Sequence, residues 1–174
     1  MESRRFWIGL GSFALLACVA GCATWPRSAA PELRLNTGRY GHAVVAADRQ
    51  LYVVGGSGPE GLLGDIEVLD PRTGQSATVA TNLIPRRYHS AVLVGRKIYV
   101  VGGESEMGPE PAVEIFDLDA RTVSLGAPLP TPRRLSKAAW LDGSIYVVGG
   151  QDHANRFAET GTRVVEAYDV AKNE

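Results

Sequence analysis

Cysteine is almost missing from this sequence. The two cysteines, Cys18 and Cys22, both lie within the first 22 residues, in a stretch with the character of an export leader. The chain after this leader has no internal disulfide, no thiol nucleophile and no cysteine ligand for zinc. Cysteine catalysis and cysteine-based metal sites are therefore excluded for the folded domain.

An excess of either charge is also missing. The chain has 18 Lys and Arg against 19 Asp and Glu, a net charge of −1, whereas a nucleic-acid-binding domain carries a basic surface. There are three histidines, and no phosphate-binding loop, G-x-S-x-G or H-E-x-x-H motif occurs. We expect no nucleic-acid partner, no cofactor, no metal and no catalytic residues.

One long uncharged run is present, at the N-terminus. Arg4 and Arg5 precede a stretch without charge from Phe6 to Pro26, which is the arrangement of an export signal. The run leads into V-A-G-C, which resembles a bacterial lipoprotein box and implies a lipid on the Cys22 thiol. We expect residues 1–22 to be a helical lipoprotein signal peptide that tethers the mature chain to a membrane of the bacterial cell envelope.

Alternatives to this leader stay open. The run is long enough for an uncleaved signal anchor, the chain can be secreted, and Cys18 is a second lipidation candidate. S-R-R-F-W-I also resembles a twin-arginine export signal. Ala23 stands where inner-membrane retention uses Asp, which favours the outer membrane or the periplasmic face. We expect residues 23–38 to be a tether, in which Leu33 to Asn36 are a candidate outer strand.

An internal repeat occupies the remainder of the chain. The string Y-V-V-G-G occurs three times in register, at a spacing of 47 residues, and ends at Gly56, Gly103 and Gly150. An E-x-x-D segment follows each copy, and the third copy has a five-residue insertion before it. We expect three units, at 39–85, 86–132 and 133–174, of which the third is incomplete.

Each unit has the pattern of a four-stranded meander. In the second unit we expect a strand from His89 to Val94, a two-residue turn at Gly95-Arg96 and a strand from Lys97 to Val101. The apolar I-Y-V-V run suits a strand covered on both faces, and the diglycine permits positive φ and a close approach of neighbouring backbones. A Gly- and Pro-rich loop then leads to the E-x-x-D strand and a fourth strand. One such sheet cannot bury both faces alone, so the repeat predicts an all-β fold of β-propeller blades.

These residues resemble the kelch motif, which implies a kelch-type propeller over Arg39 to Asp169. The recurring signature residues, taken as structural, are Arg39, Gly55, Gly56, Glu67, Arg86, Gly102, Gly103, Glu114, Arg133, Gly149, Gly150 and Glu166. The tryptophan of the motif is absent, and Ser76 and Val123 stand in its place. Three units are also fewer than the four to eight blades of a typical ring. We expect either a fragment of a longer propeller, which we favour, or copies that associate through their open blade faces.

The recurring polar side chains have two interpretations each. His42 and His89 share one position of the repeat, where they are either a metal or acid–base pair or scaffold residues that reach solvent near the rim. Arg39, Arg86 and Arg133 either ring a channel and attract an anion, or cap a neighbouring blade and pair with the recurring glutamates.

Loops that differ between the units are better candidates for a binding site. The candidate ligand-binding residues are Glu104, Glu106, Asp152, His153, Asn155, Arg156 and Phe157. Glu110 lies near the two glutamates, which are either cation ligands or part of a solvated acidic loop. The third loop suits hydrogen bonding to, and stacking on, a sugar or a peptide.

Two functions follow. The first is a non-catalytic binding module with an unknown protein or glycan partner. The second is a fragment of a larger carbohydrate-active propeller, similar to mutarotases or galactose oxidases, whose catalytic blades are missing. The radical copper site of galactose-oxidase-like proteins needs a tyrosine crosslinked to a cysteine, which this domain does not contain.

Overall fold

The computed structural model describes residues 32–152 and 161–174. These residues form an all-β fold, as the repeat predicts, and no helix among them is long and apolar enough to cross a membrane. The expected signal helix, Cys22 and four of the candidate loop residues, His153, Asn155, Arg156 and Phe157, lie outside the described residues.

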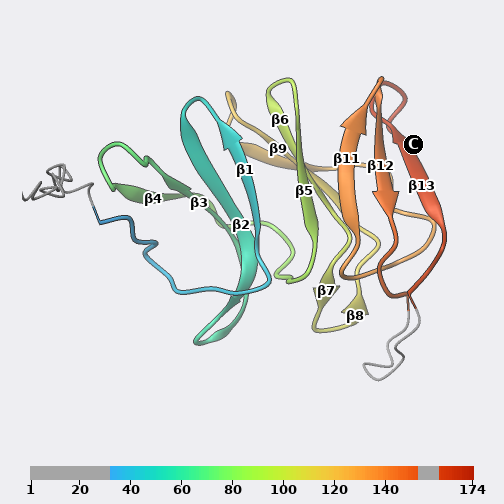
Figure 1. Ribbon diagram of the computed structural model, residues 1–174, viewed down its shortest axis with the longest axis horizontal. Coiled ribbons are helices and arrows are strands. Elements are labelled where there is room, and N and C mark those ends of the chain that lie inside the picture. The colour runs from blue at the N-terminus through green and yellow to red at the C-terminus, as the bar shows by residue number, and fades with distance from the viewer. Residues whose placement is uncertain (1–31, 153–160) are drawn as a thin grey trace, which may run out of the picture. The chain divides into compact units, whose positions relative to one another are not determined.

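Three antiparallel sheets follow one another along the chain (Figure 1). The first contains β1 (Ala43–Ala47), β2 (Gln50–Gly58), β3 (Gly61–Leu69) and β4 (Ser76–Ala80), in that order. The second contains β5 (Ser90–Val94), β6 (Lys97–Val101), β9 (Val113–Asp117) and β10 (Thr122–Leu125). The third contains β11 (Lys137–Leu141), β12 (Ser144–Val148) and β13 (Val165–Asp169). The innermost strands β1, β5 and β11 are neighbours, which is the arrangement of propeller blades.

Tight hairpins join the first two strands of each sheet. Val94 pairs with Lys97 across the Gly95-Arg96 turn, as predicted. In the first sheet the turn residues Asp48 and Arg49 have φ of 50° and 63°, and in the third Asp142 and Gly143 have φ of 48° and 88°. Positive φ at both central residues is the property of a type I′ turn, whose twist matches that of paired strands.

The segments after the diglycines are more regular than the sequence predicts. The Gly- and Pro-rich stretch of the first unit is a continuation of β2 and β3, which pair as far as Gly58 and Gly61. In the second unit β7 (Glu104–Ser105) and β8 (Gly108–Pro109) form a separate short hairpin. The expected loops are therefore ribbons, because backbone pairing continues past the diglycine bulge.

The outer part of the first sheet also differs from expectation. Leu33 to Asn36 form no strand in the structure. Instead, the Asn36 backbone N–H donates a hydrogen bond to the Glu67 carboxylate, which holds this segment against the first sheet.

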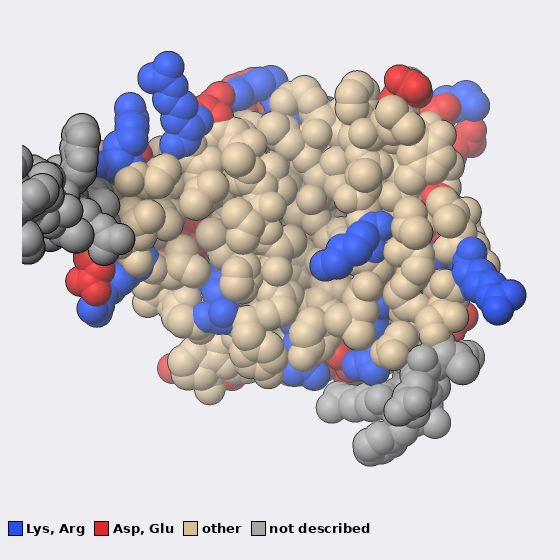
Figure 2. All heavy atoms as spheres, viewed as in Figure 1, with Lys and Arg blue, Asp and Glu red and all other residues tan. Residues whose placement is uncertain are grey.

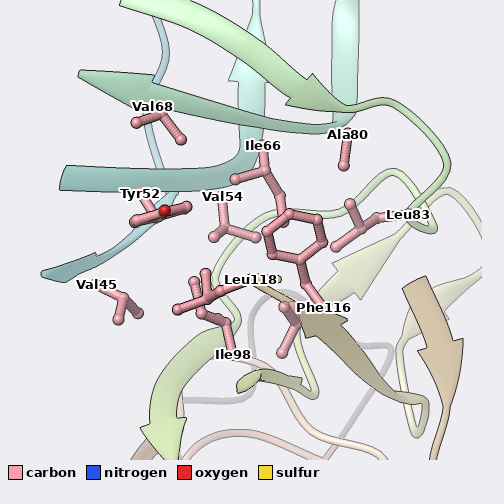
Figure 3. Packing of buried hydrophobic residues seen from close by; sticks show 11 residues of the cluster. Val45, Tyr52, Val54, Ile66, Val68, Ala80, Leu83, Ile98, Phe116 and Leu118 are labelled. Carbon is pink, nitrogen blue, oxygen red and sulfur yellow. The ribbon is translucent and has the colours of Figure 1, made fainter. Parts of the chain in front are cut away.

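The hydrophobic core lies between the sheets rather than within any one of them. One cluster joins the first and second sheets, with Tyr52, Val54 and Ile66 from the first against Ile98 and Phe116 from the second (Figure 3). A second cluster joins the second and third sheets in the same way, and the pair Tyr99 and Tyr168 replaces Tyr52 and Phe116. Each sheet is thus stabilised by apolar burial against its neighbour.

The diglycines lie where the sheets approach most closely. A Cβ on Gly102, whose φ is +66°, would lie 2.7 Å from the Arg133 carbonyl oxygen of the next sheet. The adjacent Gly103 N–H donates to this same carbonyl at 2.8 Å, and the Gly56 N–H donates to the Arg86 carbonyl at 2.8 Å. Only glycine combines this backbone conformation with this contact.

Candidate interaction site

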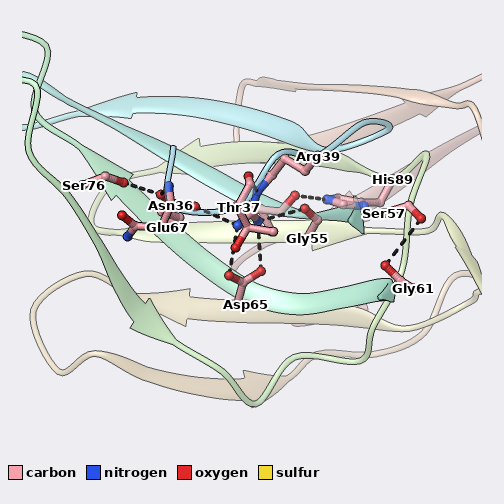
Figure 4. A network of polar contacts seen from close by, with 11 residues as sticks. Asn36, Thr37, Arg39, Gly55, Ser57, Gly61, Asp65, Glu67, Ser76 and His89 are labelled. Atoms are coloured by element: carbon pink, nitrogen blue, oxygen red, sulfur yellow. Dashed lines mark hydrogen bonds and ion pairs between the residues drawn. The ribbon is translucent and has the colours of Figure 1, made fainter. Parts of the chain in front are cut away.

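Each sheet contains a buried arginine–glutamate pair behind its diglycine. In the first sheet, Arg39 contacts the carboxylates of Glu67 and Asp65 at 2.8 and 2.9 Å, and its Nη1 donates to the Gly55 carbonyl at 3.1 Å (Figure 4). Ser76 donates its hydroxyl to Glu67 from β4. The carboxylates therefore neutralise the guanidinium and hold it against the strand end.

The same pair recurs in the other two sheets. Arg86 Nη2 lies 2.5 Å from Glu114, and Arg133 Nη2 lies 3.0 Å from Glu166. Arg86 and Arg133 are 2% and 0% exposed. Burial lowers the pKa of Arg86 and raises the pKa of Glu114, which shows that the pair is held at a cost in solvation.

The pairing interpretation of the recurring arginines is thus confirmed, and these three side chains do not present charge to an anion in a channel. The surface over β1, β5 and β11 agrees with this result, because it is formed mostly by uncharged residues (Figure 2).

The recurring histidines take a different place from the one expected. His89 is 5% exposed rather than open to solvent at the rim, and its Nε2 lies 3.1 Å from the Val54 carbonyl of the preceding sheet. Burial, followed by the charge of Arg86, lowers the pKa of His89 to about 3. Burial also lowers the pKa of His42. His89 is therefore a neutral tie between two sheets, and no cluster of metal-ligating side chains occurs among the described residues.

A second set of side chains occupies the next position of the repeat: Tyr40, Arg87 and Arg134. Each forms an isolated backbone bridge to the stretch after its diglycine, and the partners are Ser57, Glu104 and Gln151. For example, the Arg87 N–H donates to the Glu104 carbonyl at 3.0 Å and the Glu104 N–H donates back at 2.8 Å. The repeat thus fixes the backbone of this set, whereas the side chains change from unit to unit.

These side chains interact across the sheet boundaries. Arg87 Nη1 donates to the Tyr40 hydroxyl at 3.0 Å, and its guanidinium carbon lies 6.0 Å from the centroid of the Tyr40 ring and 5.0 Å from that of Tyr88. Glu104 lies between the two cations, 3.4 Å from Arg87 and 3.0 Å from Arg134. We call Tyr40, Arg87, Tyr88, Arg134 and Leu135 the Tyr–Arg patch.

Part of the patch faces solvent. Tyr40 is 53% exposed and Leu135 is 47% exposed, whereas Arg134 is buried beneath them. A hollow of about 260 Å³ lies beside Arg87 and is lined also by Ser57, Leu62, Glu104 and Glu106. An apolar surface with a fixed guanidinium and a polar hollow next to it can hold a peptide segment.

The backbone of the patch is strained. Tyr88 and Leu135 have φ of 57° and 59°, a left-handed conformation that is rare for bulky residues, while the first unit has Gly41 at the same position with φ of 65°. Such conformations tend to occur at functional sites.

The structure separates the acidic candidates of the second loop. Glu104 is 5% exposed and bound to two arginines, so it is not part of a solvated acidic loop. Glu106 is exposed beside it, while Glu110 accepts a hydrogen bond from the Ala112 N–H at 3.1 Å. Asp152 is half-buried at the end of the third diglycine segment.

The sequence interpretation did not include the Tyr–Arg patch. Its one signal is the position directly after each recurring arginine, where Tyr, Arg and Arg follow one another at the repeat spacing. Another hollow, of about 410 Å³, lies between the first two sheets beside Ser76, Tyr52 and Phe116.

These features define a class of protein: stacked, four-stranded propeller blades with a buried Arg–Glu pair per blade and variable side chains at one end. The chain belongs to the Kelch-repeat family, since residues 22–173 match the family model described as the KLHDC2/KLHL20/DRC7 Kelch-repeats domain. Membership of this family indicates a protein-interaction module. A comparison with curated proteins found no match.

Proposed function

We propose that this chain is a non-catalytic protein-interaction module that binds a partner through the Tyr–Arg patch. The observation that carries the proposal is the contact of Arg87 with Tyr40, at 3.0 Å from the hydroxyl, on a surface where Tyr40 and Leu135 are about half exposed. Tyrosine and arginine are the residue types enriched in the energetic centres of protein interfaces.

The geometry reduces the entropic cost of binding. Arg87 is stacked on Tyr88, hydrogen-bonded to Tyr40 and paired with Glu104, so its guanidinium is oriented before a partner arrives. Tyr40 is held by two backbone hydrogen bonds to Ser57, at 3.0 and 2.8 Å. A patch that loses little freedom on binding retains more of its contact energy as affinity.

We further propose that a lipid on Cys22 holds the module at a membrane of the bacterial cell envelope. This proposal is supported by the leader sequence, in which a basic start, an uncharged run and V-A-G-C precede Cys22. Mass spectrometry of the membrane-extracted protein tests it. We expect a chain that begins at Cys22 and carries acyl groups; an unmodified chain that begins at Met1 would exclude the lipid.

The binding proposal is tested by site-specific photocrosslinking in cells that produce the protein. A photoreactive phenylalanine at position 40 is expected to give an adduct of one defined mass, and Arg87→Glu in the same chain is expected to reduce its yield at least tenfold. The matched control carries the photoreactive residue at position 125, because Leu125 is 69% exposed on β10, away from the patch.

An adduct of equal yield at positions 40 and 125, or one that Arg87→Glu leaves unchanged, would contradict binding through the patch. Arg96→Glu is the matched charge control, since Arg96 is half exposed and pairs with Asp48 and Asp119 at the hairpin turns. We expect this variant to crosslink as the native chain does.

A further inference from the structure

One face of the third sheet is uncovered although its counterparts are core. We call it the forward face, because in the first and second sheets it contacts the next sheet along the chain. Tyr52 and Tyr99 are 7% and 5% exposed there, whereas the equivalent Tyr146 is 37% exposed. Val54 and Val101 are each 1% exposed, and the equivalent Val148 is 49% exposed. The forward face of the third sheet thus carries the same residues as the buried faces without their partner.

The third diglycine is uncovered in the same way. A Cβ on Gly55 or Gly102 would lie 2.9 or 2.7 Å from the arginine carbonyl of the next sheet, whereas a Cβ on Gly149 would meet nothing within 4 Å. Gly149 nevertheless has φ of +65°, close to the +66° of Gly102. The backbone is therefore already in the conformation that accepts a neighbouring blade.

The two internal boundaries show what covers such a face. At both of them, the second glycine donates to the carbonyl of the next recurring arginine, at 2.8 Å. At the first boundary, His89 contacts the Val54 carbonyl at 3.1 Å, and the Tyr88 N–H donates to the Gly41 carbonyl at 2.7 Å. The matching covering element is the start of an inner strand with its recurring arginine.

The first sheet of the same chain carries this element. Arg39 and His42 stand one repeat before Arg86 and His89, and Gly41 stands one repeat before Tyr88. Val44 of β1 is 49% exposed, whereas its equivalent Ala91 of β5 packs into the core between the first two sheets. One chain therefore contains both halves of a boundary that it already forms twice.

We propose that the first sheet of a second copy of this chain docks on the forward face of the third sheet. In this contact the Gly150 N–H donates to the Arg39 carbonyl of the other copy, His42 contacts the Val148 carbonyl, and the Gly41 N–H donates to the Leu135 carbonyl. Two copies that make this contact reciprocally contribute six sheets, a number within the range of four to eight at which propellers close. This inference is independent of the Tyr–Arg patch.

The oligomeric state of the full chain tests the inference. The experiment is sedimentation velocity in a nonionic detergent, over a concentration series, with far-UV circular dichroism of each variant. We expect two copies per particle for the native chain. A native chain that stays a single copy at tens of micromolar would overturn the proposal without any variant, as would a natural polypeptide in which a fourth repeat follows Glu174.

Two variants locate the contact. Val148→Asp puts a charge on the forward face, and Val44→Asp puts one on the docking face of the first sheet; both side chains are half exposed in the single chain, so the fold tolerates the change. Each variant is expected to weaken association at least tenfold, and an equimolar mixture is expected to recover part of it, because one intact contact remains. Leu125→Asp, on β10, is the control and should associate normally.

The combination excludes other dimers. If two forward faces packed on each other, Val44→Asp would associate like the native chain, and this result would overturn the proposed head-to-tail contact. Association that neither variant weakens would overturn it as well.

Discussion

His42 and His89 stand 47 residues apart at the same position of the repeat, and their surroundings differ because one of them follows another sheet. His89 is enclosed between the first two sheets and contacts the Val54 carbonyl. His42 has no preceding sheet within the described chain, and it is partly open. A residue of this repeat is therefore determined by its neighbours in space as much as by its position in the unit.

The surroundings of His89 predict a loss of stability in acid. Its pKa in the folded chain is lowered to about 3 by burial and by Arg86, against an ordinary value near 6.5. The unfolded chain therefore takes up a proton first, so the stability that His89 contributes is complete above about pH 6.5 and is lost as the pH falls toward 3. We expect the free energy of unfolding to fall by about 1 kcal/mol per pH unit in this window, measured by urea unfolding.

The variant His89→Gln isolates this effect. Burial raises the pKa of Glu114, which acts in the opposite direction, and this contribution is present in both proteins. We expect the variant to lose less stability than the native chain between pH 6.5 and 4. An identical pH dependence would show that His89 titrates normally in the folded chain.

The strain at Leu135 leads to a second prediction at this scale. Leu135 has φ of 59° and is 47% exposed, while the first unit uses Gly41 at the same position. Because glycine adopts this conformation without strain, Leu135→Gly is expected to raise the free energy of unfolding by about 0.5 kcal/mol despite the added chain entropy. Leu125→Gly, in a strand of ordinary conformation, is expected to lower it. Equal losses in urea unfolding would contradict the strain.

At the scale of the elements, the diglycine and the next arginine carbonyl form one joint. Gly102→Ala adds both left-handed strain and a Cβ at 2.7 Å from the Arg133 carbonyl, whereas Gly149→Ala adds similar strain in open space. In dilute protein, where single copies dominate, we expect a cost of about 1 kcal/mol for Gly149→Ala and at least twice that for Gly102→Ala. Thermal unfolding measures the difference. Equal costs would show that the close approach is not a constraint.

The elements that could be predicted are those in which the repeat places the same residue types in the same register. The Gly95-Arg96 hairpin and the Arg86–Glu114 pair are of this kind, since both recur in every unit. The Tyr–Arg patch could not be predicted in this way, because its side chains change between units and their contacts cross the sheet boundaries. Glu104 shows the reason: its partner Arg134 comes from the next unit, 30 residues away.

Short ribbons after the diglycines escaped prediction for a different reason. Gly and Pro are common in turns, so S-G-P-E-G-L-L-G has the composition of a loop. In the structure, β2 and β3 continue through it because their backbones remain paired beyond the bulge at Gly55. Pairing with a neighbouring strand outweighs the local preference of the residues.

At the scale of the whole molecule, stability resides in the boundaries between sheets. The described residues contain two such boundaries, each with an apolar cluster, an aromatic pair and a glycine-to-arginine backbone bond. The forward face of the third sheet repeats the residues of a boundary without a partner in the chain. The fold and the proposed association thus follow from one repeated contact.

Amide hydrogen exchange of the diglycines in dilute solution tests this contact most directly. The Gly56 and Gly103 N–H groups donate to the next arginine carbonyl at 2.8 Å, and Gly150 is their equivalent in the third sheet. We predict that the Gly56 and Gly103 amides exchange at least a hundredfold more slowly than unstructured amides, and that the Gly150 amide becomes protected only as the protein concentration rises. Exchange of Gly56 and Gly103 at the rate of unstructured amides would contradict the stacking of the sheets.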